Sequence, residues 1–385
     1  MANVRPRRIC LIVSSPLTVK AFLLDQITAL SRVYDVTLIA NFEDRGFLDQ
    51  LAMNVKVAAV PIERKISPMR DAYALLRLYQ LFRSNLFDAI HAITPKASLL
   101  AMVSGFLAGV PVRIHAFSGQ VWLTRTGISR FILKNIDRLA PALATHTLVD
   151  CPSQKDFLIK ERFIKESKST ILGNGSICGV DCERFQPNPH ARNRVREELG
   201  IGPEDLIFLY VGRLNKDKGV FDLARAFSQL VTRPYQAHLL IVGPDEEAMR
   251  PEIEKICAAT PGRLHFHDYT DTPQIYMSAS DILCLPSYRE AFGVVIIEAA
   301  STGIPAIGSR IFGITDAIIE GKTGLLHEPG NVDDLAAKMD QLAQNRELRE
   351  SLGRQARERV RRDFPREKVT SALLAYYQGL LADTK

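Results

Sequence analysis

Two glutamates, Glu290 and Glu298, stand with seven residues between them in the stretch Leu285–Pro305, which reads LPSYREAFGVVIIEAASTGIP. The pattern predicts that Glu290 lies in a loop after a short apolar strand and that Glu298 lies on the helix that follows. If the intervening residues are mostly helical, the two carboxylates lie roughly 10–12 Å apart. That distance is too long for a shared proton, but it suits a grip on two hydroxyl-bearing parts of one long ligand. A solvated loop glutamate and an ordinary helix glutamate are the alternative.

The predicted helix opens at Phe292, Gly293 and Val294. A helix N-terminus carries unpaired N–H groups and a partial positive charge, which favour a phosphate. Since Gly293 has no side chain, a ligand can approach these backbone amides closely.

Two cations, Arg213 and Lys218, follow a predicted strand at Leu206–Val211. The segment Gly212–Arg213–Leu214 leaves this strand, and Lys218–Gly219 opens a helix. An arginine can bind two phosphate oxygens at once, and a lysine is a compact point charge. The sequence therefore predicts an anion site in this loop, with solvated surface charge as the alternative.

The string E290-AFGVVII-E298 closely resembles the Glu-x₇-Glu motif of retaining GT-B glycosyltransferases, in particular family 4. The segment GRL-x₃-KG at 212–219 resembles the diphosphate clamp of the same family. The resemblance implies that Arg213 and Lys218 neutralise the departing diphosphate, aided by the amides of residues 292–294. It also implies that Glu298 binds the ribose and that Glu290 binds hydroxyls of the donor sugar. By position in the family, the donor-binding set also includes Gly212, Gly243 and Tyr269.

His115 closes a predicted strand in the N-terminal half, in the segment RIHAFSGQVW. A core histidine bonded to backbone is the alternative, while the resemblance implies that His115 contacts the donor sugar. Many relatives carry a Gly-Gly pair in the first loop, where this chain has Ser14–Ser15–Pro16. The strand ends of this half supply further candidates near the donor and acceptor: Ser15, Pro16, Thr18 and Lys96. The segments SPLTVKAFLLDQITAL, TPKASLLAMVSGFLAGVPVRIHAFSGQVW and ILGNGSICGVDCERF resemble the branch that builds bacterial capsule and O-antigen units.

Strands and helices alternate along both halves, which predicts doubly wound parallel sheets. The first strand is followed by a predicted turn at Ser14–Thr18 and a predicted helix at Val19–Arg32. The predicted strands of the N-terminal half are Ile9–Val13, Val36–Ala40, Val55–Val60, Ala89–Ala92 and Arg113–Ala116, and those of the C-terminal half include Leu206–Val211 and Leu264–His267. Glycines and prolines between residues 173 and 189 interrupt the pattern. With the resemblance, we expect an α/β GT-B fold of two Rossmann-like domains that face a central cleft. The expected divisions are an acceptor-binding domain over 1–180, a donor-binding domain over 181–365, and a helix over 366–385 that crosses back to the first domain.

Arg130, Lys134 and Arg138 lie on one helical stripe beside a run of apolar residues, and five more lysines and arginines follow. A basic amphipathic surface is typical of contact with an anionic membrane. A solvated charged face is the alternative. No nucleic-acid motif accompanies the basic residues.

The chain has 385 residues, 46% hydrophobic and 24% charged, with a net charge of +6, which is enough for two α/β domains. The apolar run at Ile9–Val13 is too short for a signal peptide, and no window is long enough to span a bilayer. We therefore expect a cytoplasmic protein, peripheral on the inner membrane. The six cysteines form no Cys-x-x-Cys pair, and no Asp-x-Asp motif is present, so we expect no metal and no cofactor.

The resemblance thus implies a retaining, metal-independent hexosyltransferase. We expect it to move a sugar, an N-acetylated hexosamine or a deoxyhexosamine, from a UDP-sugar to a saccharide linked to undecaprenyl diphosphate, in capsule, O-antigen or exopolysaccharide synthesis. Two alternatives remain: a UDP-sugar 2-epimerase of the same fold, which turns over UDP-GlcNAc without an acceptor, and a non-catalytic sugar-nucleotide-binding protein. The Glu-x₇-Glu motif and the intact set of four charged residues favour the transferase.

Overall fold

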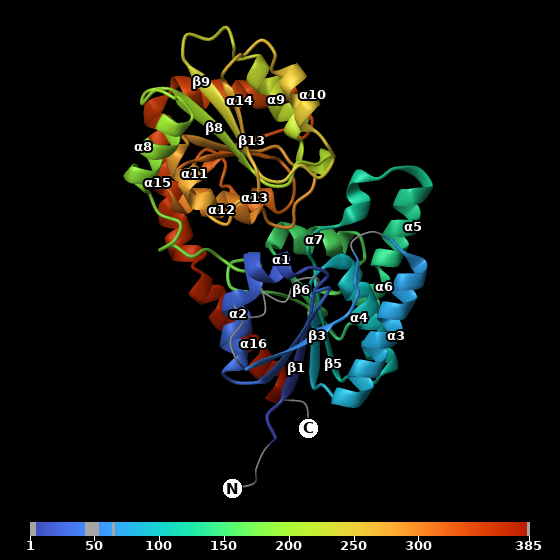
Figure 1. The fold of residues 1–385 in the computed structure, drawn as a ribbon. Helices are drawn as coiled ribbons and strands as arrows, with labels where there is room; N and C mark the ends of the chain where they lie inside the picture. The colour runs from blue at the N-terminus through green and yellow to red at the C-terminus, as the bar shows by residue number, and fades with distance from the viewer. Residues whose placement is uncertain (1–4, 43–53, 64–65, 383–385) are drawn as a thin grey trace. The chain divides into compact units, whose positions relative to one another are not determined.

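The computed structural model describes residues 5–42, 54–63 and 66–382, and the chain divides into two compact units. Unit 1 comprises Met1–Cys178 together with Arg366–Lys385, and unit 2 comprises Gly179–Pro365. Each unit is built on a parallel sheet with helices on both faces (Figure 1). The expectation of two doubly wound α/β domains is therefore confirmed.

The sheet of unit 1 has seven parallel strands in the order β3-β2-β1-β4-β5-β6-β7. The strands are β1 (Arg8–Ile12), β2 (Asp35–Ala40), β3 (Val55–Ala59), β4 (Ala89–Ala92), β5 (Val112–Ala116), β6 (His146–Val149) and β7 (Ser169–Ile171). The central strands are short runs of apolar residues without alternation, because helices bury both of their faces. The sequence analysis expected β1–β5 close to these bounds, but it did not identify β6 and β7.

Two helical layers cover the unit 1 sheet. One core contains side chains of α3 and α4, and the other contains side chains of α2 and α16, so these pairs lie on opposite faces of the sheet (Figure 1). The helices of the unit are α1 (Pro16–Thr18), α2 (Leu24–Ser31), α3 (Pro68–Asn85), α4 (Pro95–Leu107), α5 (Gly127–Asp137), α6 (Leu139–Leu143), α7 (Pro152–Lys160) and α16 (Arg366–Ala382). Leu373 and Tyr377 of α16 are buried in this core, so the last helix belongs to the N-terminal unit.

The first helix begins earlier than the sequence analysis expected. Ser14–Thr18 was expected to be a turn, but α1 starts at Pro16, and a π-helical turn at Val19–Leu23 joins it to α2. Ser15 caps the helix because its hydroxyl accepts from the Leu17 amide. A serine cap followed by proline at the first helical position is a strong start pattern, and it overrides the turn propensity of the segment.

The sheet of unit 2 has six parallel strands in the order β10-β9-β8-β11-β12-β13. The strands are β8 (Leu206–Val211), β9 (Ala237–Val242), β10 (Leu264–His267), β11 (Ile282–Leu285), β12 (Ala306–Ser309) and β13 (Gly324–His327). The helices are α8 (Pro189–Glu198), α9 (Val220–Ser228), α10 (Arg250–Ile256), α11 (Pro273–Ala279), α12 (Val294–Ser301), α13 (Ile314–Ala317), α14 (Val332–Gln344) and α15 (Arg346–Asp363). Strand β8 lies between β9 and β11, so the strand order reverses at β8, and ligands bind such sheets at this point beyond the carboxyl ends of the strands.

Candidate active site

The four charged residues that the sequence singles out in unit 2 follow two neighbouring strands. Arg213 and Lys218 come after β8, while Glu290 and Glu298 come after β11, and these strands pair directly. Since the sheet is parallel, all four side chains belong to the same edge. This edge is where the strand order reverses, so the structure gathers the set at the expected ligand-binding position of the fold.

Gly219 allows the two loops that carry these residues to meet. It has a positive φ of 66°, and a Cβ there would lie 2.0 Å from the carbonyl oxygen of Pro286. The contact is reinforced where the Tyr288 amide donates to the Asp217 carbonyl (2.9 Å) and where Arg289 forms an ion pair with Asp217 (2.8 Å). These contacts hold the Lys218 loop against the Glu290 loop.

The cations of the site are paired with carboxylates. Lys218 forms an ion pair with Glu290, which also accepts a hydrogen bond from Ser287 (3.0 Å). Arg213 forms an ion pair with Glu246 at 2.8 Å. A bound diphosphate would therefore compete with two protein carboxylates for the same cations.

Glu298 differs from Glu290 because the described residues provide no hydrogen bond to its carboxylate. Burial raises the pKa of Glu298 to about 7, and the positive charge of Arg184 only partly opposes this effect. Glu298 is half-buried, and a carboxylate that has lost part of its hydration is stabilised when a ligand supplies hydrogen-bond donors. Its environment fits an acceptor of hydroxyl hydrogen bonds.

The N-terminus of α12 lies between the two glutamates. Gly293 caps the helix with φ 82°, so glycine suits this position. Phe292 is buried and packs edge-on against Phe364 (5.4 Å), so its side chain belongs to the core and only its amide can serve the site. The first amides of α12, including that of Val294, have no intrahelical acceptor.

The glycines after β8 and β9 are required by packing. A Cβ at Gly243 would lie 2.0 Å from the carbonyl oxygen of Gly212, so the loops that leave these strands touch at the backbone. Tyr269 lies beyond β10, is half-exposed, and donates to Asp271 at 2.6 Å. These three predicted donor-binding residues border the same edge of the sheet, but no contact joins Tyr269 to the charged set.

Sequence reasoning missed Tyr210, whose hydroxyl donates to the Arg213 carbonyl (2.8 Å) and fixes the start of this loop. Burial raises the pKa of Tyr210 far above its usual value, and the nearby Glu290 and Glu246 raise it further. Glu246 and Asp217 were missed as well, because ion pairs across loops have no pattern in sequence.

His115 occupies β5 of unit 1 and is buried. Neither ring nitrogen has a hydrogen-bond partner among the described residues, and the ring packs edge-on against Phe117 (4.3 Å). Burial lowers the pKa of His115 to about 3, and His91 lowers it further, so the ring is neutral. A core histidine bonded to backbone is thus not what the structure shows. The two unsatisfied nitrogens are available to a polar ligand.

The other predicted residues of the N-terminal loops have local structural roles. Ser15 and Pro16 start α1, and Thr18 ends it. Lys96 lies in the first turn of α4, where it forms an ion pair with Asp71.

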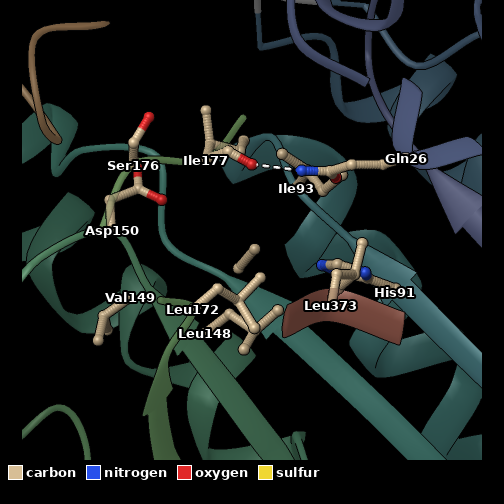
Figure 2. Close-up of a pocket in the computed structure, with 11 residues that line it drawn as sticks. Gln26, His91, Ile93, Leu148, Val149, Asp150, Leu172, Ser176, Ile177 and Leu373 are labelled. Carbon is tan, nitrogen blue, oxygen red and sulfur yellow. Dashed lines mark hydrogen bonds between the residues drawn. The ribbon is translucent and has the colours of Figure 1, made fainter. Parts of the chain in front are cut away.

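A small cavity of about 20 Å³ opens at the carboxyl ends of β4, β5 and β6 (Figure 2). It is lined by Gln26, His91, Ile93, Ala116, Leu148, Val149, Asp150, Leu172, Ser176, Ile177 and Leu373. Asp150 and Ser176 lie on one side and His91 on the other (Figure 2). This volume is enough for about one water or one hydroxyl group.

Three groups in this cavity are unusual. Burial raises the pKa of Asp150 to about 7, and burial lowers the pKa of His91 to about 4. His91 accepts from or donates to the Tyr377 hydroxyl through Nδ1 (3.0 Å), but its Nε2 has no partner among the described residues. Ser176 is buried with a positive φ of 72°, which is rare for serine. Asp150 follows β6, a strand that the sequence analysis did not identify, so Asp150 escaped notice with it.

The three basic residues predicted to face a membrane lie on or next to α5. Lys134 forms an ion pair with Glu161, and Arg138 donates to the Glu161 carbonyl at 3.2 Å. Arg130 is exposed and lies 5.7 Å from the Trp122 ring centroid. All three cations therefore contact side chains or backbone of unit 1.

The residues that the structure describes are 5–42, 54–63 and 66–382. These residues contain no group of three or more His, Cys, Asp or Glu side chains that could hold a metal ion. They also contain no helix that is long and apolar enough to cross a membrane.

Comparison with known families gives two matches that cover the two halves of the chain. Residues 19–184 match the model of Glycosyltransferase Family 4, and residues 191–359 match the model of Glycosyl transferases group 1. The first match corresponds to unit 1 and the second to unit 2.

Curated relatives and solved structures agree with these matches. The chain is 28% identical over 328 residues to the capsular polysaccharide biosynthesis glycosyltransferase CapM of Staphylococcus aureus, covering 85% of this chain and 86% of that protein. It is 28% identical over 306 residues to the UDP-Gal:α-D-GlcNAc-diphosphoundecaprenol α-1,3-galactosyltransferase of Escherichia coli, covering 78% of each. HepE of Anabaena, solved with UDP and glucose, has the same fold, with a TM-score of 0.80 at 17% identity over 97% of this chain and 100% of that chain. Glycosyltransferase family models thus match both units, and the chain has the GT-B fold.

Proposed function

We propose that the protein transfers a hexosyl group from a UDP-sugar to a lipid-linked saccharide, with retention of the anomeric configuration and without a metal ion. The observation that carries the proposal is the gathering of Arg213, Lys218, Glu290 and Glu298 at the edge of unit 2 where the strand order reverses.

In this proposal the cations bind the central diphosphate of the donor, and the two carboxylates bind the sugar on one side and the ribose on the other. Arg213 and Lys218 bind the diphosphate, and they release Glu246 and Glu290 when it arrives. Glu290, once released, accepts hydrogen bonds from hydroxyls of the sugar, while Glu298 accepts them from the ribose. UDP as the nucleotide is supported by the UDP-linked relative of Escherichia coli and by HepE, which was solved with UDP-glucose.

Catalysis follows from where the negative charge develops. As the bond between sugar C1 and the phosphate oxygen breaks, charge accumulates on the departing diphosphate, so the fixed cations stabilise the transition state more than the ground state. The acceptor hydroxyl attacks C1 from the same face, and its proton passes to the departing phosphate oxygen. Loss of one such cation is expected to lower turnover by roughly 10²–10³.

The acceptor proposal rests on the relatives. CapM acts in capsular polysaccharide biosynthesis, and the galactosyltransferase of Escherichia coli acts on a diphosphoundecaprenol-linked sugar. By analogy, this protein extends a saccharide on undecaprenyl diphosphate in capsule, O-antigen or exopolysaccharide synthesis, working as a peripheral protein on the cytoplasmic face of the inner membrane. An N-acetylated hexosamine or a deoxyhexosamine is the proposed sugar.

The test is a donor screen with purified full-length protein, followed by transfer assays with and without EDTA. We expect UDP and one UDP-sugar to raise the unfolding temperature, and that donor to label a lipid-linked acceptor, with unchanged activity in EDTA and an unchanged anomeric configuration by NMR. Turnover of UDP-GlcNAc without an acceptor would instead identify an epimerase. Folded protein that responds to no nucleotide would overturn the donor site.

A further inference from the structure

Large apolar side chains that are exposed to solvent concentrate on unit 1. Of the nineteen found among the described residues, sixteen belong to unit 1 and only Tyr269, Tyr288 and Ile319 belong to unit 2. Scattered exposed apolar residues are normal, but clusters on one part of a protein indicate an interaction surface. Unit 1 therefore carries a surface that unit 2 lacks.

The largest cluster lies on α5. Ile128, Phe131, Ile132 and Ile136 are 79%, 71%, 50% and 44% exposed, and α5 has no buried residue at all. Their spacing places them on one side of the helix. In a helix of a soluble domain, a side of this composition normally faces the core, whereas in α5 it faces away from the rest of unit 1.

Contacts on the opposite side of α5 fix this orientation. Lys134 pairs with Glu161 and lies 4.9 Å from the Trp122 ring centroid, and Arg138 lies 5.2 Å from the Phe163 ring centroid. Asp137 accepts a hydrogen bond from the indole of Trp122 at 3.0 Å. The charged side of α5 is thus anchored to unit 1, which leaves the apolar side outward.

A second apolar stripe lies on α3. Met69, Tyr73 and Leu76 are 85%, 54% and 51% exposed, with the i, i+4, i+7 spacing of one helix face. α3 packs on α4, α4 on α6, and α6 is next to α5, so both stripes belong to the helical layer on one side of the sheet (Figure 1). A surface spread over separate helices fits an extended partner better than a single bound peptide.

Charge identifies the kind of partner. Residues 125–168 contain nine lysines and arginines against five aspartates and glutamates, an excess of four out of the net six of the whole chain. Such an excess attracts an anionic surface, and it would repel the same surface of a second copy.

We propose that α5 and α3 form a docking surface for an anionic lipid bilayer, with α5 lying in the interface and its residues Ile128, Phe131 and Ile132 inserted among the acyl chains. The apolar side chains enter the bilayer, while exposed basic residues near α5, such as Arg125, meet the lipid phosphates. This surface locates the contact between the protein and the membrane. The inference rests on the proposed function only for the purpose of that contact, which is to reach a lipid-linked acceptor.

The test is vesicle flotation of the full-length protein, with phosphatidylcholine vesicles that contain or lack phosphatidylglycerol. We expect binding to the anionic vesicles and much weaker binding to the neutral ones. The variant Ile128→Ser/Phe131→Ser should reduce the vesicle partition coefficient at least about tenfold, because each side chain loses its apolar transfer. Val33→Ser is the matched control, since Val33 is 50% exposed at the end of α2 on the other side of the sheet, and it should bind as the wild type does.

Two further measurements separate this proposal from the others. Stabilisation by UDP should be the same in wild type and in the α5 variant. If UDP fails to bind both while vesicle binding behaves as expected, the proposed function fails and the docking surface stands. The docking surface is refuted if the α5 variant binds anionic vesicles as strongly as the wild type does, or if the wild type does not bind them. If light scattering shows a dimer of the wild type without lipid and a monomer of the α5 variant, the partner of this surface is a second copy of the chain and the bilayer proposal is wrong.

Discussion

Replacement of Lys218 by methionine separates its two roles, the ion pair with Glu290 and the proposed binding of phosphate. The substitution keeps the apolar stem but leaves the Glu290 carboxylate with the Ser287 hydroxyl alone. The paired side chains are only 19% and 14% exposed, so losing one partner should cost about 1–3 kcal/mol. For a domain of this size, each kcal/mol shifts the unfolding temperature by about 2–4 °C. We therefore expect the melting transition of unit 2 to fall by about 2–12 °C.

The double variant Lys218→Met/Glu290→Gln removes the orphaned charge and should recover most of that loss. Binding of UDP should not recover. At a hundred times the dissociation constant, UDP stabilises the wild type by about 2.7 kcal/mol. Loss of a charge-assisted hydrogen bond worth about 1.5–3 kcal/mol reduces this to about 0.3–1.3 kcal/mol in both variants. Scanning calorimetry with and without UDP measures both quantities.

Two control variants test whether the effects are specific to Lys218. Lys216 lies on the same turn, is exposed, and makes no side-chain contact with a described residue, so Lys216→Met should change neither stability nor UDP binding. Glu290→Gln alone should keep the response to UDP and lose the extra stabilisation that the sugar of a UDP-sugar provides. If the double variant retains the full response to UDP, Lys218 does not bind the phosphate and the reasoning fails.

Further substitutions test the other features. The pKa of Glu298 is about 7 in the folded protein and 4.5 in the free side chain. Its contribution to the stability of the folded protein is therefore complete below pH 4.5 and disappears as the pH rises through 7. Glu298→Gln should raise the melting temperature at pH 8 but not near pH 4, and it should weaken UDP binding. The pKa of Asp150 is raised in the same direction, so Asp150→Asn should also raise the melting temperature at pH 8. If Asp150 contacts the acceptor, this variant should have a higher KM for the acceptor and unchanged UDP binding by calorimetry. His115 is neutral throughout the working range, so His115→Gln should lower kcat about 10²-fold, at the lower end of the range for one lost transition-state contact. The shape of the pH–rate profile should stay the same. Gly219→Ala should lower the melting temperature far more than Gly262→Ala, because both glycines have positive φ but only Gly219 has a carbonyl oxygen 2.0 Å from the added Cβ, and circular dichroism melts compare them directly.

Local patterns in the sequence were sufficient for most of the fold. The apolar runs predicted β4 and β8 at their observed bounds, because these strands are buried on both faces. β10 was also predicted at its observed bounds, although it is only half-buried. β6 and β7 escaped because they are short, four and three residues, and begin with polar residues. The start of α1 was misplaced because the helix-capping pattern of Ser15 and Pro16 was read as a turn.

The sequence by itself also determined which charged residues follow the two strands, because motif spacing places Arg213 and Lys218 after β8, and Glu290 and Glu298 after β11. Only the tertiary structure decided the state of those charges. Pairing of Lys218 with Glu290 depends on two loops that approach at Gly219, a contact between residues 72 positions apart. The outward direction of the apolar side of α5 likewise depends on where Glu161 and Trp122 lie, which periodicity cannot show. A sequence pattern fixes which face of a helix is apolar, whereas packing fixes where that face points.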